Sequence, residues 1–154
     1  MASNKKITRE SNLFGKSSNK VIAYTDGGAR GNPGPAALGV VIKYSGSKKE
    51  YGEYIGETTN NVAEYSAIVF ALKKIKQLFG KGEAKKLEVE IRADSELAVR
   101  QLSGVYKIEN GELQKLFMEI WNLKLDFKHV MFTHVPRAQN VGADQMVNLA
   151  LDNQ

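Results

Sequence analysis

The chain has 154 residues, of which 42% are hydrophobic and 25% are charged, a composition typical of one globular domain with a sizeable core. It contains no cysteine, which excludes disulfide bonds, thiolate metal sites and a cysteine nucleophile, and it has no apolar run long enough to span a membrane. The N-terminus also lacks the apolar core of a signal peptide, so we expect a cytoplasmic protein.

The net charge of +5 is concentrated near the N-terminus. Residues 1–20 contain five basic residues and one acidic residue, so the remaining 134 residues carry a net charge of only +1. We expect a basic, disordered tail at 1–19, because this segment is polar and has no hydrophobic periodicity, followed by one domain at 20–154. A solvated leader is favoured over a loose phosphate-binding arm.

Three β-strands are predicted at the start of the domain. Residues 21–25, rich in β-branched and aromatic side chains, predict a central strand, and residues 36–44 and 50–55 predict two more. Short connections imply that these strands pair as antiparallel hairpins. The first strand ends on Asp26 and two glycines, a pattern typical of turns, although ligands also bind at the carboxyl ends of central strands.

The hydrophobic period then becomes helical. Apolar residues at steps of three and four predict a helix over residues 60–79, capped by Thr58 or Thr59 and closed by Gly80 and Gly82.

The second half of the domain alternates strands and helices. The predicted elements are a strand at 87–93, a helix at 95–102, a helix with apolar residues from 113 to 123, a strand at 128–134 and a helix at 141–151. The order β-β-β-α-β-α-α-β-α predicts an α/β fold with a five-stranded mixed sheet, in which three antiparallel strands precede parallel ones. Helices cover both faces of this sheet.

Four carboxylates lie near the ends of these elements. Because right-handed crossovers place the fourth strand parallel to the first, Asp26 and Asp94 meet at one edge of the sheet. Glu64 and Asp144 are near the starts of helices that can face the same edge, although the topology does not require it. Taken alone, Asp94 is a good N-cap, and Glu64 and Asp144 complement helix dipoles.

Four motifs, in order and at suitable spacing, resemble type 1 ribonuclease H. They are the segments 24–34, 59–64, 94–95 and 135–144. The resemblance covers residues 21–152 and is strongest to compact members with a Val-Pro-Arg segment after the last strand. It implies the ribonuclease H-like fold and an Mg²⁺-dependent endonuclease that cuts the RNA strand of RNA/DNA hybrids. Its products would carry 5′-phosphate and 3′-hydroxyl ends.

The resemblance also implies roles for individual residues. The family's metal ligands correspond to Asp26, Glu64, Asp94 and Asp144, which would hold two Mg²⁺ ions, with Mn²⁺ able to substitute. The minor-groove contacts that sense 2′-hydroxyls correspond to Gly27, Gly28, Asn32, Asn60 and Asn61, and a phosphate contact on the DNA strand corresponds to Thr59. The simpler alternatives are turn chemistry for Asn32 and helix capping for the Asn60-Asn61 pair.

Two departures from the family pattern affect these roles. Many members have a loop histidine near the last aspartate, and His134 has the same offset from Asp144, but it precedes Val135 at the end of a strand. We expect a packed or substrate-facing histidine there and assign the catalytic cation to Arg137. The basic protrusion that some relatives insert after the second helix is missing. Lys107 and Asn110, which follow that helix, either contact the nucleic-acid backbone or belong to a solvated loop. This predicts weak hybrid binding with little salt dependence, unless the tail contributes.

The expected partner is an RNA/DNA hybrid, bound by a monomer without an obligatory protein partner or a membrane. Two other classes share the fold: a nucleic-acid binding module without catalysis, and a nuclease of different specificity. The carboxylate set disfavours the first, because a phosphate-binding module has no use for four negative charges without metal. The Gly27-Gly28 and Asn60-Asn61 pairs favour 2′-hydroxyl sensing over the second.

Overall fold

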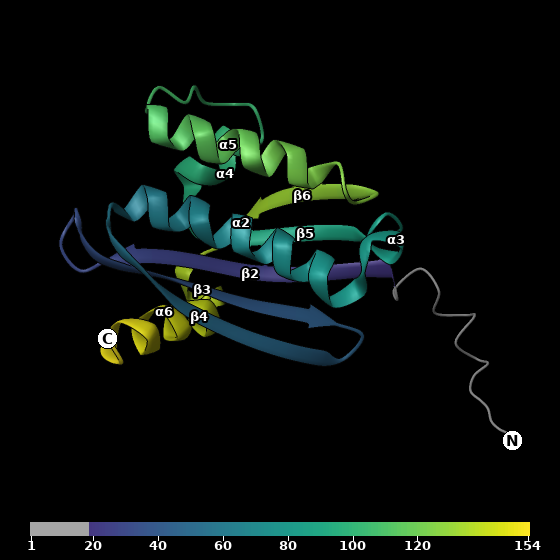
Figure 1. The fold of residues 1–154 in the computed structure, drawn as a ribbon, viewed down its shortest axis with the longest axis horizontal. Helices are drawn as coiled ribbons and strands as arrows, with labels where there is room; N and C mark the ends of the chain where they lie inside the picture. Colours follow the sequence, from purple (N-terminus) through teal and green to yellow (C-terminus); the bar gives the residue numbers. More distant parts are fainter. Residues whose placement is uncertain (1–18) are drawn as a thin grey trace, which may run out of the picture.

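The computed structural model of the protein describes residues 19–154, and the remainder of the predicted tail lies outside them. Figure 1 shows the arrangement of the elements. They are β2 (Lys20–Ala29), β3 (Gly34–Tyr44), β4 (Ser47–Thr58), α2 (Asn60–Phe79), α3 (Lys81–Ala84), β5 (Glu88–Ala93), α4 (Glu96–Leu102), α5 (Gly111–Lys124), β6 (His129–His134), the 3-10 helix η3 (Arg137–Gln139) and α6 (Val141–Asp152).

The strands form one five-stranded sheet in the order β4-β3-β2-β5-β6. Strands β2, β3 and β4 pair antiparallel, whereas β5 is parallel to both β2 and β6. Helices α2, α4 and α5 cover one face and α6 covers part of the other (Figure 1). The predicted mixed sheet, with β2 at its centre and helices on both faces, is confirmed.

The main core lies between the sheet and α2. Side chains of α2 that are at most 1% exposed, such as Tyr65, Ile68 and Leu72, pack against strand residues such as Val21 and Ile91. Burying each large apolar side chain contributes about 1.5–3 kcal/mol, so this layer anchors both β2 and the first turns of α2. Among residues 19–154, no helix combines the length and apolar character that a bilayer crossing requires.

Strand β2 is longer than predicted. The expected end after Thr25 holds only for the pairing with β5, whose last pair is Thr25 with Ala93. On the other side, β2 continues to Ala29, because Gly27 and Gly28 pair with residues of β3. The two glycines therefore form no turn, and Asp26 remains at the carboxyl edge of the parallel half of the sheet. Strand β4 likewise extends beyond the predicted 50–55 at both ends.

Two short elements were not predicted. Gly80, with a φ of 87°, ends α2 as expected, but Gly82 lies within the one-turn helix α3. The 3-10 helix η3 fills the segment between β6 and α6. Both are single turns, too short to show a hydrophobic period. The N-cap of α2 is Thr59, whose Oγ1 accepts a hydrogen bond from the Val62 amide at 3.2 Å.

Gly27 permits the closest approach between β2 and α2. A Cβ atom at this position would overlap the backbone of Ala63 and Glu64, whereas one on Gly28 would meet only Val147 Cγ1 at 3.7 Å. We expect Gly27→Ala to lower the free energy of unfolding by about 3 kcal/mol or more, because backbone atoms must move apart. Chemical denaturation should show a change below about 1 kcal/mol for the matched variant Gly28→Ala. Equal stability of the two variants would contradict this packing.

Candidate active site

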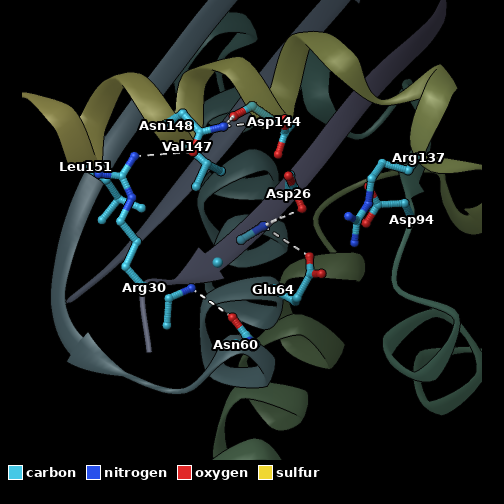
Figure 2. A pocket seen from close by; sticks show the side chains of 13 residues that line it. Asp26, Arg30, Asn60, Glu64, Asp94, Arg137, Asp144, Val147, Asn148 and Leu151 are labelled. Atoms are coloured by element: carbon cyan, nitrogen blue, oxygen red, sulfur yellow. Dashed lines mark hydrogen bonds between the residues drawn. The ribbon is translucent and has the colours of Figure 1, made fainter. Parts of the chain in front are cut away.

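A polar cavity of about 330 Å³ opens where the carboxyl end of β2 meets α2 and α6. All four predicted carboxylates line it: Asp26 on β2, Glu64 on α2, Asp94 after β5 and Asp144 on α6 (Figure 2). Carboxylate oxygens of Asp26, Glu64 and Asp94 all lie within 4.8 Å of one another. Asp144 is on the cavity wall formed by α6 and is not part of that close trio. The structure thus brings together four side chains that are far apart in the sequence.

One backbone group holds two of the carboxylates in place. The Gly27 amide donates to Asp26 Oδ1 at 3.0 Å and to Glu64 Oε1 at 3.1 Å (Figure 2). This shared hydrogen bond requires α2 to lie directly against β2, which the missing side chain of Gly27 allows. The first turns of α2 therefore place Glu64 over the end of the strand and not toward solvent, so its interpretation as a solvated dipole-complementing residue is wrong.

The carboxylates of the cavity disfavour one another's ionisation. Burial, followed by the charges of Asp94 and Asp144, raises the pKa of Asp26 to about 7. Burial, followed by the charges of Asp26 and Asp94, raises the pKa of Glu64 to about 9. The Gly27 hydrogen bond and Arg137 oppose the second shift without cancelling it. The four carboxyl groups therefore do not all ionise near neutral pH unless positive charge joins the site.

Asp94 does not cap the helix that follows it. Ser95 is the N-cap of α4, and its Oγ accepts a hydrogen bond from the Ala98 amide at 3.2 Å. The carboxylate of Asp94 instead accepts a hydrogen bond at 3.3 Å from Asn140 Nδ2, which also donates to the Thr25 carbonyl at 2.9 Å. Asn140 is 1% exposed and precedes α6, so this one side chain ties together three segments that carry carboxylates.

Three of the six predicted substrate-binding residues line the cavity. Gly27, Gly28 and Asn60 line it, and Asn60 Oδ1 accepts a hydrogen bond from the Ala29 amide at 2.8 Å. Asn32 Oδ1 accepts one from the Asn60 amide at 3.0 Å. Both side-chain carbonyls are thereby engaged by backbone, which leaves their NH₂ groups as the donors. Capping by the two asparagines of α2 is wrong, since Thr59 caps this helix.

Five residues named as possible substrate contacts do not line the cavity: Asn32, Thr59, Asn61, Lys107 and Asn110. Asn61 is exposed in the first turn of α2. Thr59 uses its hydroxyl oxygen as a helix cap, which leaves its proton free to donate. Asn110 is exposed in the loop before α5, as the solvated-loop alternative predicts, and its Oδ1 caps α5 by accepting a hydrogen bond from the Leu113 amide at 3.0 Å.

The structure distinguishes the two candidates for the catalytic cation, Arg137 and His134. Arg137 in η3 lines the cavity and faces the carboxylates closely enough to lower the pKa of Glu64. His134 is the last residue of β6, pairs with Ala93 and does not line the cavity. The residue is exposed, so the packed alternative is wrong, and the substrate-facing alternative stays a prediction.

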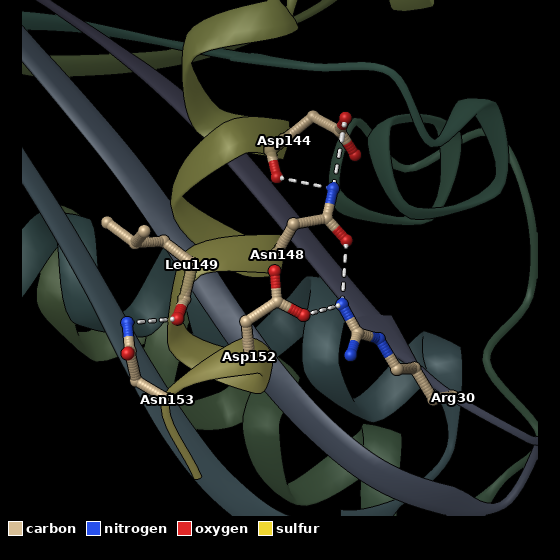
Figure 3. A network of polar contacts seen from close by, with 6 residues as sticks. All are labelled: Arg30, Asp144, Asn148, Leu149, Asp152 and Asn153. Atoms are coloured by element: carbon tan, nitrogen blue, oxygen red, sulfur yellow. Dashed lines mark hydrogen bonds and ion pairs between the residues drawn. The ribbon is translucent and has the colours of Figure 1, made fainter.

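A network that the sequence did not indicate leads from α6 to the end of β2 (Figure 3). Asn148 Nδ2 donates to the Asp144 carbonyl at 3.2 Å and to Asp144 Oδ2 at 3.5 Å. Its Oδ1 faces Arg30 at 3.5 Å, and Arg30 also pairs with Asp152 at 2.7 Å. Arg30 thereby determines which end of the amide faces Asp144. The spacing of four residues between Asp144 and Asn148 on a predicted helix was the signal that could have found it.

Known proteins share this architecture. The chain matches the family model described as reverse transcriptase-like over residues 24–150. A bifunctional protein of Mycobacterium tuberculosis and ribonuclease HI of Halobacterium salinarum are each 40% identical to it over 136 residues. These matches cover 86% and 87% of this chain. The chain spans only 36% of the length of the first relative and 65% of the second.

Two solved structures match this chain over nearly their whole length. LC11-RNase H1, isolated from compost by a metagenomic approach, is 49% identical with a TM-score of 0.81, over 88% of this chain and 97% of its own. Its structure in complex with an RNA/DNA hybrid is similar to this chain with a TM-score of 0.78 over 86% of this chain and 97% of its own. Since sheet order, family model and near full-length structural likeness agree, the chain belongs to the type 1 ribonuclease H family.

Proposed function

We propose that this protein is an endonuclease that hydrolyses the RNA strand of RNA/DNA hybrids and leaves 5′-phosphate and 3′-hydroxyl ends. The observation that carries the proposal is the convergence of Asp26, Glu64 and Asp94 within 4.8 Å, with Asp144 in the same cavity. The hybrid bound to LC11-RNase H1 supports the choice of substrate.

The donor set fits divalent metal ions. It consists of carboxylate oxygens, the ligands that Mg²⁺ prefers, and the pKa values of Asp26 and Glu64 are raised because both groups are buried and lie beside other carboxylates. We propose Mg²⁺ as the resident cation, with two ions held by Asp26, Glu64, Asp94 and Asp144, and Mn²⁺ as a substitute. When bound, such a pair activates water and stabilises the charge on the leaving 3′ oxygen.

The residues of the chain itself then bind and orient the substrate. Arg137 places a permanent positive charge beside the cavity, where it can hold a backbone phosphate. The free NH₂ groups of Asn32 and Asn60, together with Asn61, donate to 2′-hydroxyls and base edges in the wide minor groove. The missing side chain of Gly28 allows the ribose to approach the strand closely, and Gly27 contributes its backbone to the same cavity wall while its Cα packs against α2. Thr59 donates its hydroxyl to a phosphate of the DNA strand.

We infer further that the enzyme is a monomer, needs neither a protein partner nor a membrane, and acts in the cytoplasm. All of the proposed site residues come from one chain, which supports the first point. The lack of cysteine fits a reducing compartment.

A cleavage assay tests the proposed function. End-labelled RNA/DNA, RNA/RNA and DNA/DNA duplexes of one sequence are each incubated with Mg²⁺, Mn²⁺ or EDTA. We expect internal cuts in the RNA of the hybrid, with either metal and not with EDTA. Binding of the hybrid without cleavage would point to a non-catalytic module, and cleavage of the DNA duplex would point to a nuclease of different specificity.

Arg137 and His134 are distinguished by matched alanine variants. We expect Arg137→Ala to lower kcat about 10- to 100-fold, because a cation facing the phosphate is lost. His134→Ala should lower kcat less than about threefold, since this exposed side chain is outside the cavity. Steady-state kinetics on one hybrid measure both variants, and the reverse order would assign the cation role to His134.

A further inference from the structure

The near-neutral charge of the folded part conceals a separation of charge along the molecule. One end is formed by the start of β2, the β3–β4 turn, the end of α2 with α3, and the junction of α5 with β6 (Figure 1). This basic end carries ten lysines against five carboxylates, whereas the rest of residues 19–154 carries eight cations against eleven carboxylates. Its lysines are Lys20, Lys43, Lys48, Lys49, Lys76, Lys81, Lys85, Lys86, Lys124 and Lys128.

The pairing of strands and helices gathers these lysines at one end. Lys20 pairs in register with Glu88, and Lys43 pairs with Lys48 across the hairpin. The ring of Phe79, at the end of α2, packs on Tyr44 of the same hairpin with ring centroids 4.7 Å apart. Lys20 is six residues before Asp26 on one strand, which places it about 20 Å from the carboxylate cavity.

Ion pairs neutralise only half of the positive charge. The five carboxylates of the basic end, Glu50, Glu83, Glu88, Glu90 and Asp126, each lie within 3.7 Å of one of its lysines. Five lysines have no carboxylate within 4 Å in the described part of the chain: Lys43, Lys49, Lys81, Lys85 and Lys124. Two of these lie over aromatic rings, Lys43 over Tyr24 and Lys124 over Trp121. The other three, Lys49, Lys81 and Lys85, are exposed.

We propose that the basic end binds the phosphodiester backbone of nucleic acid outside the segment that is cleaved. A polyanion that approaches the protein is attracted to the basic end and repelled by the carboxylates of the cavity. This supports a first contact at the basic end, before the nucleic acid enters the cavity. Strand β2 also begins at this end, with Lys20 as its first residue. The choice of nucleic acid as the partner rests on the proposed function.

The test uses the full chain and an all-DNA duplex in EDTA, so that neither cleavage nor metal is required. Fluorescence anisotropy measures the Kd between about 50 and 200 mM salt, the range over which phosphate contacts dominate affinity. We expect Lys81→Gln/Lys85→Gln to weaken binding about fivefold and to reduce the slope of log K against log salt by about 1–2. Lys81→Arg/Lys85→Arg should retain wild-type affinity, because the charge remains.

A matched control separates this surface from net charge. Lys73→Gln/Lys74→Gln removes two charges from the C-terminal half of α2, outside the basic end, where Lys73 pairs with Glu119 at 2.8 Å, and should change the Kd less than about twofold. Equal weakening in both double variants, or no weakening in either, would overturn the proposal. Tighter binding to phosphatidylglycerol vesicles than to the duplex, at equal phosphate concentration, would assign the surface to membranes and also overturn it. The cleavage rate on a short hybrid is measured as well. If the kcat of Lys81→Gln/Lys85→Gln equals that of the wild type, the proposed function stands whether or not the variant binds the DNA duplex more weakly.

Discussion

Asp26→Asn will lower the cleavage rate of an RNA/DNA hybrid by about 10³-fold or more, while the affinity for the hybrid changes little. Asp26 contributes to the oxygen trio within 4.8 Å, and removing its negative charge leaves only Glu64 and Asp94 in that trio. The amide has nearly the same shape and can still accept the Gly27 hydrogen bond, so the fold is retained. Single-turnover cleavage and anisotropy, measured on the same substrate, separate the loss of rate from any loss of binding.

Asp152→Asn is the matched control for this variant. It makes the same chemical change in a carboxylate that is 63% exposed and does not itself line the cavity, although it pairs with Arg30 at the cavity's edge. We expect its cleavage rate to remain within about threefold of wild type, because exposed ion pairs contribute little. If Asp26→Asn kept more than a tenth of the wild-type rate, the carboxylate cavity would not be the catalytic centre.

Glu64→Gln will raise the stability of the metal-free protein at alkaline pH. Burial and two neighbouring charges raise the pKa of Glu64 to about 9 in the folded protein, above the 4.5 of an unperturbed glutamate. The folded state therefore binds more protons than the unfolded state between about pH 4.5 and 9, and the stability of the wild type falls as pH rises through this window. Glutamine cannot ionise, so at pH 8 in EDTA we expect a gain of about 2 kcal/mol, or a Tm about 4–8 °C higher.

Thermal unfolding from pH 5 to pH 9, with and without Mg²⁺, measures this effect. Mg²⁺ should raise the Tm of the wild type, because the cation compensates the crowded carboxylates, and should raise that of Glu64→Gln less. Glu53→Gln, at an exposed position of β4, should keep the pH dependence of the wild type. A wild-type Tm that did not respond to Mg²⁺ while Mg²⁺ supported cleavage would contradict this account of the site.

The local pattern of the chain was sufficient to predict its elements and their order. The β-branched and aromatic content of 21–25 and the helical period over 60–79 each reflect which side chains the core must bury, and Val21, Ala23 and Leu72 are fully buried. The positions of Asp26 and Asp94 at one sheet edge also followed, since parallel strands align their carboxyl ends. The motifs then identified Glu64 and Asp144 as the other two candidates.

Only the tertiary structure decided how these side chains meet. Gly27 looked like part of a turn, but its pairing with β3 keeps it in the strand, and its amide orients both Asp26 and Glu64. The links from Asn140 to Asp94 and from Arg30 to Asn148 join residues 46 and 118 positions apart. The separation of charge between the two ends likewise could not be predicted from the near-neutral net charge of the domain. Periodicity is a local property, whereas contacts between distant segments depend on how strands pair and on how closely helices pack against them.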